Sequence, residues 1–196
     1  MPFTAKSGKF NASINAVEFG TGDKAVKIGG ENVFPLYSFD AAIENAPKVG
    51  IEITDFGMEH EPECIKKYYE GCATLADMAR KAASMEGVDF LSFRMEGGDP
   101  NGANKSTEEL IGELKEIADA VDLPLVVCGC KNVEKDAELF SKAAEALNGK
   151  NAVILSAKEE NYKTVGAAAG LAYKQIVGAE SAVDINLAKQ LNVLIS

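Results

Sequence analysis

The stretch at residues 88–121 constrains the fold most, because it predicts a strand, a loop and a helix in succession. Between residues 90 and 96 apolar and polar side chains alternate, so Leu91, Phe93 and Met95 share one face of the strand. A strand of this mixed kind is covered by apolar helices on one side. We therefore expect the following helix to pack against the face that carries these three side chains.

The loop between this strand and its helix is rich in turn-forming residues. In residues 97–104, GGDPNGAN, the glycines permit positive φ and Pro100 fixes φ. Ser106 and Glu109 predict a capping box at the start of the helix. The helix then carries an apolar stripe at helical spacing: Leu110, Leu114, Ile117 and Val121. Polar residues thus gather at the carboxyl end of the strand, where βα folds usually hold ligands.

The same unit is repeated along the chain. The predicted strands begin at residues 49, 88, 124, 151 and about 176. The helices between them include a continuous one over residues 62–86, an alanine-rich one over 161–175 and a last one capped by Asp184. The run at residues 124–130, PLVVCGC, predicts a strand buried on both faces. Strands that alternate with helices indicate a parallel sheet with right-handed crossovers.

Five such units make either an open sheet or part of a barrel, since a complete eightfold barrel typically takes ~250 residues. Glu52 and Arg94 favour the barrel, because both project away from the helix-facing residues and should pair across adjacent strands rather than remain unpaired. We assign an α/β fold of the (βα)8 TIM-barrel type, with about the first five units at residues 49–196. An N-terminal β-hairpin within residues 13–28 and an irregular lead-in occupy residues 1–48.

Composition excludes several classes of partner. The chain has 20 Lys and Arg against 30 Asp and Glu, a net charge of −10, which repels nucleic acid and anionic lipid. No apolar run approaches the ~20 residues of a spanning helix, and the first ten residues lack the core of a signal peptide. We expect a cytoplasmic protein that binds neither membranes nor nucleic acid.

Known catalytic and metal-binding motifs are missing from the sequence. Dinucleotide, P-loop, hydrolase and cobalamin-binding signatures do not occur. The four cysteines match no common zinc or iron–sulfur spacing and are interpreted as reduced thiols. The single histidine, His60, lies among acidic residues that could attract a metal, although a solvated loop before a helix explains them better. Cys128 and Cys130 flank a glycine at a strand end, where one thiol could reach a ligand or simply be a small buried hydrophobe.

Four strings of the sequence point to one family. They are GGDPNGANKS, PLVVCGCKNVEKDAE, AKEENYK and DINLAKQLNVLI, which begin at residues 97, 124, 157 and 184. From about Ser13 to the last residue the chain resembles the small (delta) subunit of the corrinoid iron–sulfur protein, part of the acetyl-CoA decarbonylase/synthase system. The resemblance implies a (βα)8 barrel paired with a large subunit that carries a 4Fe-4S cluster and the corrinoid.

The resemblance also implies a function. The heterodimer would carry a methyl group from methyl-tetrahydrofolate, or a related methyl-pterin, to the nickel site of acetyl-CoA synthase in the Wood–Ljungdahl pathway. It would meet the methyltransferase and acetyl-CoA synthase transiently. In that family cobalt is the nucleophile, so this chain would be a scaffold and a cover for the corrinoid, without catalytic residues, a metal site or an iron–sulfur cluster of its own.

Polar residues after the strands are the candidates for contact with the corrinoid. They are Asp99, Asn101, Asn104, Cys130, Asn132 and Asn161. The first three lie in the loop after the second strand of the series and could hydrogen-bond the amide-rich rim of a corrinoid or a pterin ring. Residues 159–162 form a second patch. Side chains of these types also form hydrogen bonds to the nearby backbone in turns and helix caps without any ligand. Contact with a cofactor and a purely structural role therefore both remain open.

One departure from the family leaves other functions open. Family chains continue past the position of Ser196 through further strands, so we expect a truncated or split product that is unstable alone or associates with another chain. Two alternatives follow. The chain could be a self-sufficient βα methyltransferase that binds a pterin through Asp55, Asp99 and Asn132, or an inert remnant.

Overall fold

The computed structural model describes residues 11–32 and 43–196. The chain opens with an antiparallel hairpin of β1 (Val17–Phe19) and β2 (Val26–Ile28), joined through a short 3-10 turn at Gly22–Lys24. This confirms the predicted hairpin. Part of the irregular lead-in expected before residue 49 lies outside the described residues, and the division of the chain at residue 49 stays a prediction.

The main body is built on a five-stranded parallel sheet. Its strands are β3 (Gly50–Thr54), β4 (Phe90–Arg94), β5 (Leu125–Cys128), β6 (Val153–Ala157) and β7 (Ile176–Ala179). Their order in the sheet is their order in the chain, and every neighbouring pair is parallel. The α/β class and the five predicted strands are confirmed. Within the described residues the sheet is open, with β3 and β7 at its edges, so closure into a barrel stays a prediction.

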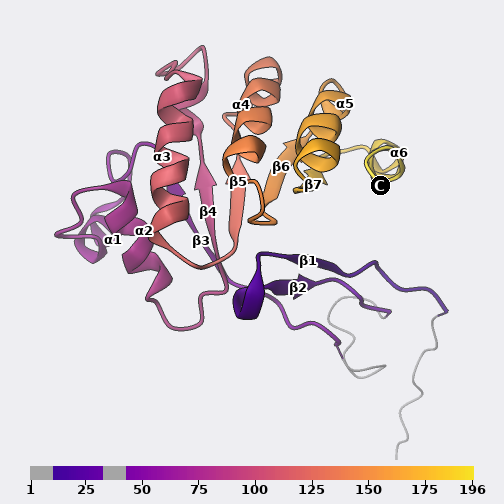
Figure 1. Ribbon diagram of the computed structural model, residues 1–196, viewed down its shortest axis with the longest axis horizontal. Coiled ribbons are helices and arrows are strands. Elements are labelled where there is room, and N and C mark those ends of the chain that lie inside the picture. The colour runs from indigo at the N-terminus through magenta and orange to yellow at the C-terminus, as the bar shows by residue number, and fades with distance from the viewer. Residues whose placement is uncertain (1–10, 33–42) are drawn as a thin grey trace, which may run out of the picture.

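Helices follow the strands in turn. They are α1 (Glu63–Tyr68), α2 (Leu75–Ala83), α3 (Thr107–Ala120), α4 (Val133–Ala146), α5 (Tyr162–Val165) and α6 (Ile185–Leu194). Right-handed crossovers between strands in sequential order place the connecting helices on one face of the sheet. Accordingly α3, α4 and α5 stand side by side across the same face (Figure 1). The opposite face is left for other contacts.

Two predicted helices differ from the structure. The continuous helix over residues 62–86 is wrong, because a turn separates α1 from α2. Gly71 in this turn has a φ of +87°, and Thr74 begins α2 with a capping box: its Oγ1 accepts from the Asp77 N–H at 3.1 Å, and the Asp77 carboxylate accepts from the Thr74 N–H at 3.2 Å. The alanine-rich helix starts as α5 but continues as a π-helix at Gly166–Ala172.

The main core lies between the sheet and the helices. Leu91, Phe93 and Met95 are each at most 1% exposed and pack with the helices, which confirms the predicted facing of this strand. The predicted stripe of α3 faces them, with Leu110, Leu114 and Ile117 buried and Val121 half-buried. All four residues of β5 are buried, as expected for its continuous apolar run. Ser106 does cap α3 through the Glu109 N–H at 3.1 Å, whereas the Glu109 side chain turns toward Lys105 at 4.0 Å.

The hairpin covers part of the other face of the sheet. Phe19 and Val26 are buried there with Val126 and Cys128 in a second, smaller apolar cluster. The ring of Phe19 meets that of Phe90 edge-on, with centroids 5.7 Å apart. Figure 1 shows the hairpin below the ends at which the strands begin. It therefore closes the amino-terminal end of this face and leaves the carboxyl end free of it.

Hydrogen bonds fix the hairpin in this position. The Asn151 side-chain amide donates to the carbonyl oxygens of Glu18 and Gly20 at 3.1 and 3.2 Å, and the Gly20 N–H donates to the Asn151 carbonyl at 2.7 Å. Gly20 has a φ of +83°, and a Cβ there would lie 2.4 Å from Pro124 Cγ. A side chain at this position would therefore separate the hairpin from the sheet.

The two charged residues predicted to pair on this face do pair. Arg94 Nε and Nη2 donate to Glu52 Oε1 and Oε2, each at 2.9 Å, across the neighbouring strands β4 and β3. Ser92 adds a hydrogen bond to Glu52 Oε2 at 3.3 Å. Such a two-pronged contact between a guanidinium and a carboxylate fixes geometry as well as charge. It pairs the two opposite charges on a face that the helices do not cover.

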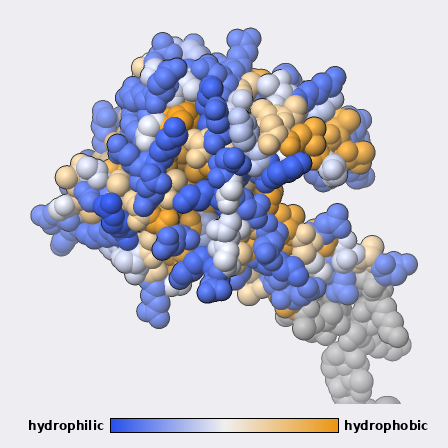
Figure 2. All heavy atoms as spheres, viewed as in Figure 1, coloured by the Kyte–Doolittle hydropathy of each residue, from blue (hydrophilic) through white to orange (hydrophobic). Residues whose placement is uncertain are grey.

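Apolar side chains are exposed near the last helix. Leu171, Val183, Ile185, Val193 and Leu194 are between 55% and 99% exposed. Figure 2 shows hydrophobic residues gathered over the end of the molecule that carries α6, whereas most of this view is hydrophilic. None of the described helices is long and apolar enough to cross a membrane. An exposed patch of this kind is typical of a surface that contacts another molecule.

The hairpin can be tested by removing its central side chain. We expect Phe19→Ala to lower the free energy of unfolding by about 3 kcal/mol, because it empties a packed position that is 3% exposed. Val17→Ala, in the same strand but 37% exposed, is the matched control and should change stability little. Urea unfolding measures both. Equal effects of the two variants would show that the hairpin does not pack on the sheet.

Candidate functional site

Parallel strands bring their carboxyl ends, and the loops that follow, to one edge of the sheet. We call this edge the rim. It comprises Asp55 after β3, residues 95–106 after β4, residues 129–132 after β5, residues 158–161 after β6 and Glu180 after β7. The Glu180 N–H donates to the carbonyl of Ala157, the last residue of β6, at 2.9 Å, which ties the last of these segments to the end of the neighbouring strand. Folds of this type place ligands at this edge.

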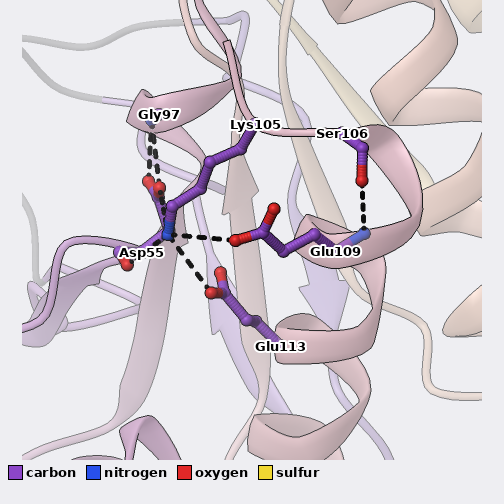
Figure 3. Close-up of polar contacts among 6 residues, drawn as sticks. All are labelled: Asp55, Gly97, Lys105, Ser106, Glu109 and Glu113. Atoms are coloured by element: carbon purple, nitrogen blue, oxygen red, sulfur yellow. Dashed lines mark hydrogen bonds and ion pairs between the residues drawn. The ribbon is translucent and has the colours of Figure 1, made fainter. Parts of the chain in front are cut away.

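An ion cluster holds the first two rim segments together. Lys105 lies between Asp55 and the acidic side chains of α3 (Figure 3). Its Nζ is 3.1 Å from Asp55 Oδ2, 2.8 Å from the Asp55 carbonyl and 3.2 Å from Glu113 Oε1. The Asp55 carboxylate also accepts the Gly97 N–H, at 2.9 and 3.1 Å. The loop after β4 is therefore fastened to the end of β3 by charge and by backbone hydrogen bonding.

The charged side chains of Asp55 and Lys105 are largely shielded from solvent, so breaking their contact costs more stability than breaking a surface ion pair would. The Asp55 side chain is 0% exposed and that of Lys105 is 19% exposed. Burial alone would lower the pKa of Lys105, but its hydrogen bonds and charge contacts with Asp55 and Glu113 outweigh burial and raise the pKa. Burial raises the pKa of Glu113, whose Oε2 is buried without a hydrogen-bond partner among the described residues. A lysine shared by two partly or fully buried carboxylates is hard to remove without a large loss of stability.

A pocket of about 270 Å³ opens at the rim between the ends of β4 and β7. Its polar lining consists of Arg94, Lys131, Asp136, Ser156, Lys158 and Glu180. Cys128 and Leu155 line it from the sheet. Burial raises the pKa of the Cys128 thiol, despite a contact with the Ser92 hydroxyl at 3.5 Å and the nearby charge of Arg94. The pocket thus combines both signs of charge with a protonated thiol.

A buried carboxylate lies at the pocket wall. Asp136 in the first turn of α4 is 4% exposed, and its Oδ1 accepts from the Cys130 N–H at 2.7 Å and from the Cys130 Sγ at 3.2 Å. Burial raises the pKa of Asp136, and burial together with the adjacent carboxylate raises the pKa of Cys130 to about 11. A Cβ on Gly129 would lie 2.2 Å from Asp136 Oδ1, which explains the glycine between the two cysteines. Cys130 is therefore a protonated hydrogen-bond donor rather than a nucleophile.

Three of the predicted site residues meet around the start of α4. Beside Cys130, Asn132 caps this helix by accepting from the Lys135 N–H at 3.0 Å. Asn161 is 4% exposed, accepts from the Lys158 N–H at 2.7 Å and donates through Nδ2 to the Val133 carbonyl at 3.3 Å. Their polar groups hold the rim segments in place. Contact of these side chains with a cofactor stays a prediction.

The other three predicted residues form a separate turn after β4. Asp99 Oδ1 accepts from the Asn101 N–H at 2.9 Å and from Asn101 Nδ2 at 3.3 Å. Asn104 has a φ of +51°, and its N–H donates to the Asp99 carbonyl at 3.1 Å. Asn101 and Asn104 remain exposed, and none of the three lines the rim pocket. These hydrogen bonds all lie within the turn and stabilise its backbone, while the amide side chains of Asn101 and Asn104 are exposed at its surface.

The acidic loop around His60 has a structural contact. The His60 ring packs edge-on against Phe56, with centroids 4.8 Å apart, and Lys105 Nζ lies 5.5 Å from the centre of the Phe56 ring. Across residues 11–32 and 43–196, no group of three or more His, Cys, Asp or Glu side chains is arranged to hold a metal ion.

Sequence reasoning missed four charged residues at the rim. Lys105, Asp136, Lys131 and Lys158 were not singled out, although the last two directly follow predicted strand ends. Position alone could have identified this pair. The contact between Lys105 and Asp55 joins residues 50 apart in the sequence and leaves no local signal.

Comparison with known proteins identifies the family. The family model of the CO dehydrogenase/acetyl-CoA synthase delta subunit matches residues 16–196. The chain belongs to this family. The resemblance found in the sequence strings is thereby confirmed over nearly the whole chain.

Three relatives of known identity illustrate the relationship, each a delta subunit of an acetyl-CoA decarbonylase/synthase complex. The one from Methanothermobacter thermautotrophicus is 31% identical over 186 residues, which cover 93% of this chain and 47% of the relative. The one from Methanocaldococcus jannaschii is 31% identical over 192 residues, 94% and 47% of the two chains. The one from Archaeoglobus fulgidus is 30% identical over 177 residues, 88% and 38%. The chain spans less than half the length of these delta subunits.

The ion cluster yields a stability prediction. We expect Lys105→Met to lower the free energy of unfolding by about 3 kcal/mol, because it leaves the buried Asp55 carboxylate without its cation. Lys115→Met is the matched control, since Lys115 is an exposed residue of α3. Urea unfolding at neutral pH distinguishes the two. A loss below about 1 kcal/mol, typical of a surface ion pair, would contradict the account of this cluster.

The thiols yield a reactivity prediction. At pH 8 we expect iodoacetamide to alkylate the exposed Cys64 and to leave Cys130 unmodified in the folded chain. Cys130 is 6% exposed, and its pKa of about 11 keeps it protonated at that pH. Mass spectrometry of peptides after timed labelling measures each site. Rapid modification of Cys130 at pH 8, at the rate of Cys64, would refute its assignment as a buried, protonated donor.

Proposed function

We propose that this chain is the small subunit of a corrinoid iron–sulfur protein and acts as a scaffold and cover for a corrinoid held by a large subunit with a 4Fe-4S cluster. The assembled protein would carry a methyl group from methyl-tetrahydrofolate or a related methyl-pterin to acetyl-CoA synthase. The observation that carries this proposal is the family match over residues 16–196, together with relatives that are named as delta subunits of acetyl-CoA decarbonylase/synthase complexes.

The rim supports a binding role. Asp55 fastens the loop after β4, and Asn161 fastens the start of α4, so the polar surface at the rim is held in one arrangement. A pre-organised surface binds a partner without the entropic cost of ordering mobile loops. The thiol of Cys130, which the sequence placed among the candidates for contact with a ligand, is protonated. These features suit a cover over a cofactor more than a site of bond formation.

The donor set at the rim also fits the chemistry of a corrinoid, whose periphery carries amide side chains. Exposed Asn101 and Asn104 can both donate to and accept from such amides. When a corrinoid is bound, its cobalt supplies the nucleophile that takes up the methyl group. The residues of this chain would orient the ring and exclude water from it.

A partner surface is supported by the exposed apolar side chains near α6. Val183 and Val193 are 99% and 78% exposed, and both would be stabilised by burial against another chain. We propose that this patch belongs to a contact with the large subunit. The methyltransferase and acetyl-CoA synthase would then bind transiently at other surfaces.

The alternative of a stand-alone pterin-binding methyltransferase receives less support. Its three proposed ligands were Asp55, Asp99 and Asn132. The Asp55 side chain is 0% exposed and is held by Gly97 and Lys105, while Asn132 caps α4 and Asp99 closes its own turn. A pterin would have to displace these contacts, so the geometry favours the subunit role.

Capture of the natural partner tests the proposal. The tagged chain should recover from native extract a large subunit with cobalt in about equal molar amount, measured by mass spectrometry of proteins and metal, together with iron–sulfur absorbance. Recovery of the chain without cobalt, under conditions in which the large subunit is present in the extract, would contradict the proposal. Tight binding of methyl-tetrahydrofolate to the isolated chain would favour the alternative instead.

A paired variant sharpens this experiment. Asn101→Ala with Asn104→Gly removes two exposed amides at the rim, and glycine accepts the positive φ of residue 104. We expect less cobalt to be recovered while the midpoint of thermal unfolding hardly changes. Asn161→Ala is the structural comparison, because loss of its buried hydrogen bonds should lower stability.

A further inference from the structure

We propose that the rim pocket between the ends of β4 and β7 binds a small oxyanion, a phosphate or a carboxylate group. The pocket, of about 270 Å³, has room for such a group together with ordered water. The proposal concerns binding to this chain alone and does not depend on the proposed role in methyl transfer.

Hydrogen-bond donors without partners carry the proposal. Within the part of the chain that the structure describes, neither the Lys131 nor the Lys158 ammonium group has a carboxylate within 4.0 Å, whereas lysines such as Lys105 and Lys142 do. No hydrogen bond is made there by the Ser156 hydroxyl either, and all three side chains line the pocket. Two ammonium groups and a hydroxyl around one hollow match the acceptor oxygens of an oxyanion.

Arg94 adds a fixed cation at the wall of the pocket. Glu52 engages its Nε and Nη2, at 2.9 Å each. The remaining nitrogen, Nη1, makes no hydrogen bond within the described residues, so it is available to a ligand. The pairing with Glu52 holds the guanidinium in place and so reduces the entropy lost when a ligand binds.

The two carboxylates that line the pocket do not cancel these donors. Asp136 is buried, and its Oδ1 is held by the N–H and thiol of Cys130. Glu180 is exposed, where water and salt weaken its repulsion of an anion. The positive charge of Lys158 offsets a small part of the rise that burial causes in the pKa of Asp136.

The backbone of Lys131 supports a specific placement of its side chain. Lys131 has a φ of +72°, a conformation that L side chains adopt at a cost of order 1 kcal/mol and that glycine adopts readily. Lys131 directly follows the buried run that ends at Cys130, and it lines the pocket. Glycine would adopt this backbone conformation with less strain, but it would place no ammonium group there.

Titration of the full chain with inorganic phosphate and with succinate tests the proposal. By isothermal titration calorimetry at pH 7 and low salt, one of the two should bind with 1:1 stoichiometry and a dissociation constant in the millimolar range or below. Preference for phosphate or for succinate assigns the ligand class. Absence of saturable binding by both anions would overturn the proposal.

Single-charge variants locate the binding. Lys131→Ala and Lys158→Ala should each weaken it about tenfold, the effect of losing one charge-assisted hydrogen bond. Lys158→Arg should retain most of the affinity. Lys115→Ala removes the same charge from an exposed site on α3 and should leave binding unchanged. Equal weakening by the Lys115 variant and the rim variants would show general charge attraction and overturn the assignment to this pocket.

Discussion

Sequential parallel pairing of five strands is the constraint on which the rest of this structure depends. Because every crossover is right-handed, the helices that follow the strands share one face, and the carboxyl ends of all five strands meet at one edge. The helix-facing side chains can then be wholly apolar, while the opposite face carries the Glu52–Arg94 pair and the docked hairpin. The rim and its pocket are consequences of this order of strands.

Much of this architecture could be predicted from the sequence, since strand periodicity and apolar runs report burial directly. The alternation from residue 90 to 96 gave the correct facing, and it led to the Glu52–Arg94 contact across two strands. The prediction of one long helix over residues 62–86 was wrong, because apolar residues keep their helical spacing through the turn that separates α1 from α2. The local capping by Thr74 and Asp77 outweighs that pattern and starts a new helix.

The candidate site was less predictable, because its contacts join distant segments and its residue types have two uses. Asp99, Asn101 and Asn132 were chosen for their position after strands, yet the same side-chain chemistry closes a turn or caps a helix. The contacts that hold the rim segments to one another join distant parts of the chain. Lys105 reaches Asp55 from another strand loop, and this depends on the assembled sheet.

Hydrogen bonds hold the rim as a polar edge in one arrangement, and the family relationship leads us to propose that this edge faces a cofactor held by another chain. Hydrogen–deuterium exchange of this chain, alone and with a cobalt-bearing partner subunit, measures that claim directly. The account predicts added protection at residues 97–105, 129–132 and 158–161, with little change on the outer surfaces of α3 and α4. Protection confined to those helices, with the rim unchanged in the complex, would contradict it.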